Sequence, residues 1–106
     1  MTELEQQIVG IISAAGDSKA KAFEAMKKIK EGNYDEARKL LAESREADLA
    51  AHKIQTQLIT AEMSGGDNRP EIGLLMVHAQ DHYMTSQLAR DMVEELIEIF
   101  EAKEGK

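Results

Sequence analysis

Several residue types are absent or scarce in this chain of 106 residues, and each absence excludes a class of protein. There is no cysteine, so disulfides, zinc–thiolate sites, iron–sulfur clusters and cysteine nucleophiles are excluded, which fits the cytoplasm. Basic residues number 13 against 20 acidic ones, and a net charge of −7 argues against binding to nucleic acid or an anionic membrane surface. No apolar run is long enough for direct membrane insertion, and the acidic N-terminus is unlike a signal peptide.

Aromatic residues make up only 4% of the chain and there is one proline, whereas alanine, glutamate, lysine and leucine are abundant, which favours helices. A first helix is predicted to begin at Thr2, which stands three residues before Glu5 as in a capping box, and to end at Gly32. Gly16, followed by Asp17, predicts a break or kink within it.

A second helix is predicted from about Tyr34 to about Met63, after the start signal of Asn33 and Glu36. The next segment, 64–69, reads as a loop, and a third helix is predicted to open at Asn68, Pro70 and Glu71 and to run to about Ala102. Because the loops are short, the helices should be antiparallel neighbours. We therefore expect an all-α, antiparallel three-helix bundle that forms a single domain over residues 1–106.

The third predicted helix has two apolar stripes, whereas a surface helix of a small bundle needs only one. The first stripe is Leu75, Ala79, Tyr83, Ser86, Val93, Ile97 and Phe100. The second is Leu74, Val77, Asp81, Met84, Leu88 and Met92. The second stripe has the spacing of a coiled-coil seam, which predicts that this helix packs against copies of itself. The alternative is a single wide core stripe in a monomer.

Asp81 lies in the middle of the second stripe, where a carboxylate is costly unless it is paired or protonated. In a cyclic assembly, identical Asp81 carboxylates would meet at the symmetry axis and would need a divalent cation or a shared proton. Alternatively, Asp81 lies at the edge of the stripe and faces water.

His78 and His82 are four residues apart and therefore lie on one helix face, with Asp81 between them. This pattern fits a metal site in which Asp81 or His52 is a third ligand. It also fits a neutral imidazole that attacks a phosphoryl group, since the reference pKa of histidine is about 6.5. A proton shuttle would need a substrate pocket that the sequence does not indicate, and a pair of partly exposed histidines without chemistry is a fourth interpretation.

The run His78-Ala79-Gln80-Asp81-His82, followed by Met84-Thr85, resembles the signature of the lactose/cellobiose-type enzyme IIA of the bacterial phosphoenolpyruvate-dependent sugar phosphotransferase system. The stretch 51–59, AHKIQTQLI, resembles the family's second helix. The likeness extends over essentially the whole chain. Tyr83 departs from the family pattern, which usually has leucine there, and its place on the first stripe leaves the chemistry unaffected.

This resemblance implies a phosphocarrier. Such proteins accept a phosphoryl group from the histidine-containing phosphocarrier protein and pass it to a cysteine of enzyme IIB, for uptake of a lactose-, cellobiose- or chitobiose-type disaccharide. It implies that His78 carries the phosphoryl group and that the protein is a homotrimer assembled through the third helix. Asp81 would lie on the threefold axis around a structural divalent cation, for which we expect Mg²⁺.

His82 is a candidate stabiliser of the phosphoryl oxygens, and Gln80 and His52 are weaker candidates for the same role. The residues themselves leave two other functions open. One is an oligomeric helical interaction module without covalent chemistry, and the other is a metal-binding bundle that uses His78, His82 and Asp81 within one subunit.

Overall fold

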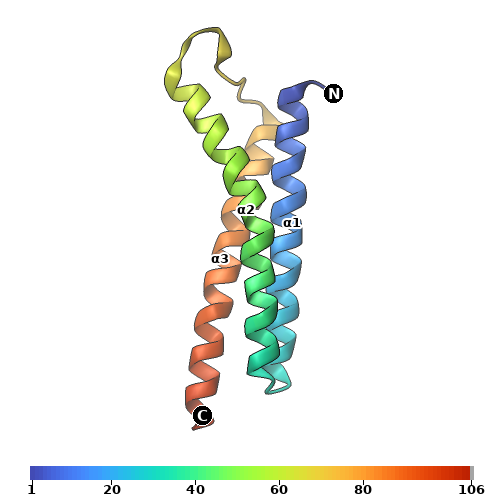
Figure 1. The fold of residues 1–106 in the computed structure, drawn as a ribbon, viewed down its shortest axis with the longest axis vertical. Helices are drawn as coiled ribbons and strands as arrows, with labels where there is room; N and C mark the ends of the chain where they lie inside the picture. The colour runs from blue at the N-terminus through green and yellow to red at the C-terminus, as the bar shows by residue number, and fades with distance from the viewer. Residues whose placement is uncertain (106) are drawn as a thin grey trace.

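Three long helices follow one another in the computed structural model, which describes residues 1–105. They are α1 (Glu3–Lys30), α2 (Tyr34–Ser64) and α3 (Leu74–Lys103), with a short 3₁₀ turn, η1 (Gly66–Asn68), between the last two. Each helix runs antiparallel to the next in a bundle of 58 × 24 × 19 Å, and the two termini lie at opposite ends (Figure 1). The predicted antiparallel three-helix bundle is confirmed; Lys106, the last residue of the predicted domain, lies outside the described residues.

The first helix begins as predicted but is not broken. The Thr2 hydroxyl accepts from the Glu5 backbone N–H, and the Glu5 carboxylate accepts from the Thr2 N–H, which completes a capping box. The predicted break at Gly16 is wrong, because α1 is continuous from Glu3 to Lys30. A glycine inside a helix costs about 1 kcal/mol relative to alanine. The buried residues on either side, Ala15 and Ser18, belong to one uninterrupted core stripe that offsets this cost.

The turn between α1 and α2 forms as the sequence predicts. Gly32 has a φ of 74°, a left-handed conformation that a residue with a side chain rarely adopts. The Asn33 side chain then accepts from the Glu36 backbone N–H at 3.3 Å and caps α2. These two residues reverse the chain and place α2 alongside α1.

The start of α3 is later than predicted. Residues 66–68 form η1, Arg69 before the proline is extended, and α3 begins only at Leu74, after Gly73. A helical turn over residues 70–73 would contain Gly73, and Glu71 and Ile72 are exposed, so no buried contact would offset the cost of ordering it. The connection therefore remains non-helical.

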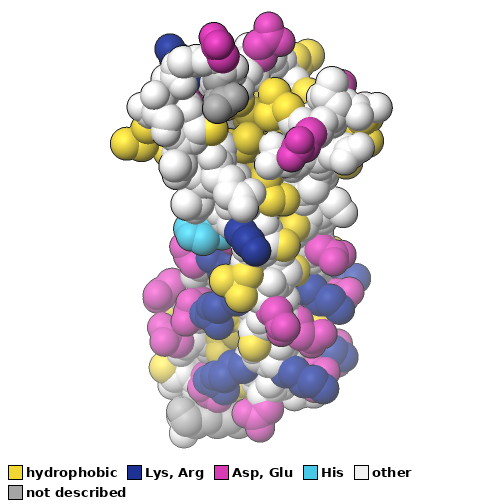
Figure 2. Space-filling view, turned by 45° about the horizontal axis from the view of Figure 1, so that its top comes forward, with side chains coloured by type: hydrophobic (Ala, Val, Ile, Leu, Met, Phe, Trp, Pro, Cys, Tyr) yellow, Lys and Arg dark blue, Asp and Glu magenta, His cyan; other side chains and the backbone are white. Residues whose placement is uncertain are grey.

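The core consists of two apolar clusters separated by a polar layer. The cluster near the α1–α2 turn contains Ile29, Leu41, Val93 and Ile97, among others, and the cluster near the α2–α3 connection contains Ile8, Ile11 and Tyr83, among others. Between them lie the four buried polar residues of the described chain: Ser18, Ser44, Asp48 and Ser86. Charged side chains cover much of one end of the bundle, whereas hydrophobic side chains gather in the hollow at the other end (Figure 2).

Helix α3 is apolar on two opposite faces, as its sequence predicts. The buried face carries Ala79, Tyr83, Ser86, Val93 and Ile97, with Met76 buried in place of the predicted Leu75. Leu75 and Phe100, which lie near the two ends of α3, are exposed. All six residues of the second stripe face solvent in the single chain, so this outward stripe has no partner within the subunit. No helix of residues 1–105 is long and apolar enough to cross a membrane.

Candidate functional site

The two histidines of α3 lie against each other on the surface. Their ring centroids are 4.5 Å apart and their planes are nearly perpendicular, at 85°, so the edge of one imidazole meets the face of the other. His78 is exposed, and no described residue hydrogen-bonds to its ring. The helix therefore presents the His78 imidazole to solvent, with His82 as its immediate neighbour.

His82 is half-buried, and its two ring nitrogens are in different surroundings. Nδ1 is buried without a hydrogen-bond partner among residues 1–105. Only the Nε2 side of the ring is left to interact with a group outside the subunit. Together the two rings can offer one nitrogen that attacks and another that donates a hydrogen bond.

Asp81 is exposed on the outward stripe of α3, between the apolar Val77 and Met84. Its carboxylate has no ion pair or hydrogen bond with another described residue. The Asp81 side chain does not point into the subunit, so its charge is not compensated by Arg90, the largely buried arginine of α3. An assembly that buries the outward stripe would have to pair or neutralise the Asp81 carboxylate.

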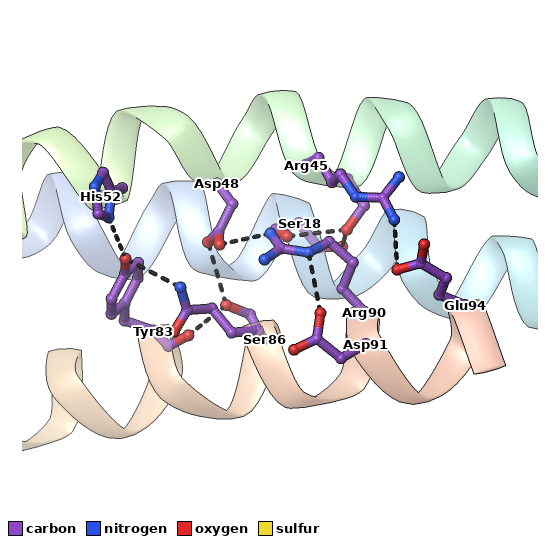
Figure 3. A network of polar contacts seen from close by, with 11 residues as sticks. Ser18, Arg45, Asp48, His52, Tyr83, Ser86, Arg90, Asp91 and Glu94 are labelled. Atoms are coloured by element: carbon purple, nitrogen blue, oxygen red, sulfur yellow. Dashed lines mark hydrogen bonds and ion pairs between the residues drawn. The ribbon is translucent and has the colours of Figure 1, made fainter.

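The third histidine, His52 of α2, is bound to Tyr83 rather than standing alone in solvent. The His52 Nδ1 lies 2.9 Å from the Tyr83 hydroxyl, and the Gln87 amide donates to the same oxygen at 3.2 Å (Figure 3). The Tyr83 oxygen accepts from Gln87, and the phenol donates its own proton to Nδ1 of His52 in the tautomer that leaves this nitrogen unprotonated. Burial, and then the negative charge of Asp48, raise the pKa of Tyr83, so the phenol keeps this proton at neutral pH.

Gln80, the third residue of the motif, is also engaged within the subunit. Its side-chain amide and that of Gln55 on α2 exchange two hydrogen bonds, one in each direction. The pair joins α2 and α3 on the flank that faces away from His78. In the single chain, therefore, two of the three candidate donors, Gln80 and His52, are occupied, and His82 is the one beside His78.

A largely buried ion pair joins α3 to α2. Arg90 donates to the Asp48 carboxylate at 2.7 Å, and the Ser86 hydroxyl lies 3.4 Å from the other carboxylate oxygen (Figure 3). Both charged side chains are largely buried, so their attraction is weakly screened. The pair therefore links α3 to α2 within the polar layer of the core.

The single-subunit metal site receives no support. Within residues 1–105 no three histidine, cysteine, aspartate or glutamate side chains gather closely enough to hold a metal ion. His78 and His82 are adjacent, but Asp81 is turned toward the outward stripe, which follows from its position on the helix.

Comparison with known proteins identifies the family of this chain. The family described as "PTS system, Lactose/Cellobiose specific IIA subunit" matches residues 6–101, which include the whole histidine motif. The chain belongs to this IIA family. Among curated relatives, the N,N'-diacetylchitobiose-specific EIIA component of Escherichia coli K12 is 41% identical over 99 residues, covering 93% of this chain and 84% of that protein.

Solved structures of IIA proteins share the fold. The cellobiose-specific enzyme IIA from Bacillus anthracis superimposes with a TM-score of 0.93 at 34% identity, over 100% of this chain and 95% of that chain. The IIA(Chitobiose) protein, in its solution structure with HPr from E. coli, has a TM-score of 0.82 at 38% identity, over 98% and 99% of the two chains. The fold and family expected from the histidine motif are thus confirmed.

The contacts that sequence reasoning missed are all between residues far apart in this IIA chain. The His52–Tyr83, Gln55–Gln80 and Asp48–Arg90 pairs each join α2 to α3. A signal was present for the last pair, because Asp48 and Arg90 both fall among apolar residues of their helices, where a charge needs a partner. The other two pairs left no comparable pattern.

Proposed function

We propose that this IIA protein is a phosphocarrier in which His78 accepts a phosphoryl group from the histidine-containing phosphocarrier protein and passes it to enzyme IIB. The observation that carries this proposal is the exposed imidazole of His78 in edge-to-face contact with the ring of His82, in a chain of the IIA family. An exposed ring on a rigid helix lets a donor protein and an acceptor protein approach the same nitrogen in turn.

The chemistry is two displacements at phosphorus. A lone pair on a ring nitrogen of His78 attacks the phosphoryl group of the donor's phosphohistidine; a new P–N bond forms, and the donor imidazole leaves with the electrons of the broken one. A cysteine thiolate of enzyme IIB then attacks the same phosphorus and releases His78. The protein contributes alignment and charge balance, and we assign His82 to the second role as a donor through Nε2.

We propose further that the protein works as a homotrimer held by α3. The support is the outward stripe, since Leu74, Val77, Met84, Leu88 and Met92 are all exposed in the single chain. Such a row of exposed apolar residues on one helix marks a surface that another protein covers. A threefold arrangement of α3 would bury this row and bring three copies of Asp81 together.

A divalent cation fits the axis of such a trimer. Asp81 offers unpaired carboxylate oxygens, which are ligands that Mg²⁺ prefers, and three of them in one place would otherwise repel each other. The ion, when bound, would neutralise this charge, and its role would be structural. The phosphoryl chemistry remains with His78 and His82.

The partners follow from this role. The E. coli IIA(Chitobiose) protein has been solved in complex with HPr, and we expect the same class of phosphocarrier protein to dock around His78 here. Enzyme IIB must reach the same imidazole, so both partners should use overlapping surfaces. With these partners, we expect the protein to be cytoplasmic. We expect this protein to contact its protein partners and not the sugar, a lactose-, cellobiose- or chitobiose-type disaccharide.

Phosphoryl transfer can be tested directly with purified components. Incubation with phosphoenolpyruvate, enzyme I and the phosphocarrier protein should yield a phosphorylated species that is acid-labile and alkali-stable, as N-linked phosphate is. Addition of enzyme IIB should discharge it. A chain that takes up no phosphoryl group would instead favour an interaction module without covalent chemistry, and omission of the phosphocarrier protein is the control.

A further inference from the structure

A groove lies between α2 and α3 near their connection. It has a volume of about 310 Å³, and its lining is mainly apolar. Leu58 and Met76 form its buried floor, while Ile59, Ile72 and Val77 are exposed along its sides. No described side chain fills it. The last turns of α2 lean away from the rest of the bundle at this end (Figure 1).

This groove is continuous with the outward stripe of α3, because Val77 belongs to both. Val77 lies on the α2 side of the stripe, the side on which Gln80 meets Gln55. Whatever covers the stripe near the start of α3 must therefore also lie against the groove. The proposed function supplies such an occupant, a second copy of this chain.

Leu74 has the position and the exposure to fill the groove of another copy. It is the first residue of α3, and 86% of its surface is exposed. At about 100° per residue, Leu74 lies about 60° from Val77, on the side of the stripe opposite α2. His78 follows one turn later and is displaced about 40° further in the same direction.

Cyclic symmetry brings these two sides together. In a cyclic trimer each interface joins one side of a subunit to a different side of the next. Rotation about the axis does not shift a subunit along it, so the same residues of all three copies lie at the same height. The Leu74 side of one α3 therefore meets the Val77 side of the adjacent α3, at the height of the groove.

We propose that Leu74 of each copy seats in the α2–α3 groove of the adjacent copy, against Ile59 and Val77. This seat involves α2 as well as α3, so the trimer interface extends beyond the contact among the three copies of α3. It also fixes the position of His78 relative to the adjacent subunit, because the histidine is one turn from Leu74 on the same side. This inference rests on the trimer of the proposed function.

Engineered cysteines can test the seat, because the natural chain contains none. One preparation carries Leu74→Cys and a second, labelled with ¹⁵N, carries Ile59→Cys; the two are unfolded together, refolded and oxidised. A disulfide requires Cα atoms about 4.4–6.8 Å apart. We expect mass spectrometry to find a disulfide between the labelled and the unlabelled chain. Leu49→Cys is the matched control, since Leu49 is a 64% exposed α2 residue outside the groove.

A mixed disulfide with Ile59→Cys and little with Leu49→Cys supports the seat. Equal reaction with both, or none with Ile59→Cys in a sample that sediments as a trimer, overturns the seat and leaves the trimer standing. A wild type that sediments as a monomer overturns both the seat and the trimer. Phosphoryl transfer is measured in a separate experiment, so its failure is distinguishable from the failure of the seat. In a second variant, Leu74→Glu should raise the dissociation constant of the trimer at least about tenfold, because it places a charge in an apolar groove, and Leu49→Glu should not.

Discussion

The three histidines of this chain show how the surroundings of a residue decide its role. His52 is tied to the Tyr83 phenol, His82 has one nitrogen buried, and His78 is exposed without a hydrogen-bond partner among the described residues. A phosphoryl acceptor needs a lone pair that a partner protein can reach in line with the bond that breaks. Of the three rings, His78 meets this requirement with the least rearrangement.

The two tyrosines, Tyr34 and Tyr83, allow a test of the electrostatics at single residues. A hydrogen bond to the Glu104 carboxylate, followed by burial and the charges of Glu104 and Glu101, raises the pKa of Tyr34 from 10.0 to about 12. A raised pKa means that the folded state holds the phenol proton more tightly than the unfolded state. The resulting stability is fully present below pH 10 and is lost as pH rises toward about 12.

We therefore expect tyrosinate absorbance to show no step near pH 10 for Tyr34, and a step near 12 that Tyr34→Phe removes. The free energy of unfolding of Tyr34→Phe should depend less on pH over this interval. Tyr83→Phe is the control, and it should leave the Tyr34 step in place. A Tyr34 step at the ordinary value of 10.0 would show that the contact with Glu104 is not formed in solution.

At the scale of the element, the ends of α1 and α2 were predictable and the start of α3 was not. Capping side chains and glycines act locally, so Thr2, Gly32 and Asn33 identify their helix ends from sequence alone. The continuity of α1 through Gly16 depends on burial against other helices, which no local pattern contains. Likewise, the late start of α3 reflects the lack of buried contacts in residues 70–73, apart from the half-buried Pro70.

Gly16 and Gly32 provide a matched test of where α1 continues and where it ends. Neither Gly16 nor Gly32 has a neighbouring atom within 4 Å of an added Cβ, but Gly32 has a φ of 74° and Gly16 is helical. Gly16→Ala should raise the free energy of unfolding by about 1 kcal/mol, because alanine favours the helix. Gly32→Ala should lower it by about 1 kcal/mol, through left-handed strain. Urea denaturation measures both; stabilisation by Gly32→Ala, or destabilisation by Gly16→Ala, would contradict the account of α1.

At the scale of the whole molecule, much of the site was predictable because its main residues share one helix. His78, Asp81 and His82 are within five positions, and helical periodicity separates the outward Asp81 from the paired rings. The contacts that hold α3 in place, such as Asp48–Arg90, depend on tertiary packing and were not predicted. Assembly is a property of several copies, so the outward stripe indicates that a partner is needed without showing its geometry.

The proposed axial cation leads to a prediction about assembly. Removal of divalent cations by a chelator should lower the melting temperature and shift the trimer toward smaller species, because three Asp81 carboxylates then repel each other. Mg²⁺ should reverse both effects. Asp81→Leu should be indifferent to the chelator and more stable than the wild type by about 1–4 kcal/mol, as is common when buried charges are replaced by apolar residues.

The matched control for this prediction is Glu24→Leu, which removes an exposed carboxylate from α1, away from the outward stripe of α3. It should keep the wild-type response to chelator and Mg²⁺ in melting and sedimentation. An Asp81→Leu variant that retains the full cation response would rule out the axial site.

The central claim is that His78 carries the phosphoryl group, and the most direct measurement is labelling of single-histidine variants. Wild type, His78→Ala and His82→Ala are incubated with labelled phosphoenolpyruvate, enzyme I and the phosphocarrier protein, and the rate of label uptake is followed. We expect no uptake by His78→Ala, and slower uptake by His82→Ala with the label still on residue 78. Uptake at the normal rate by His78→Ala, or label on His82 in the wild type, would contradict the account.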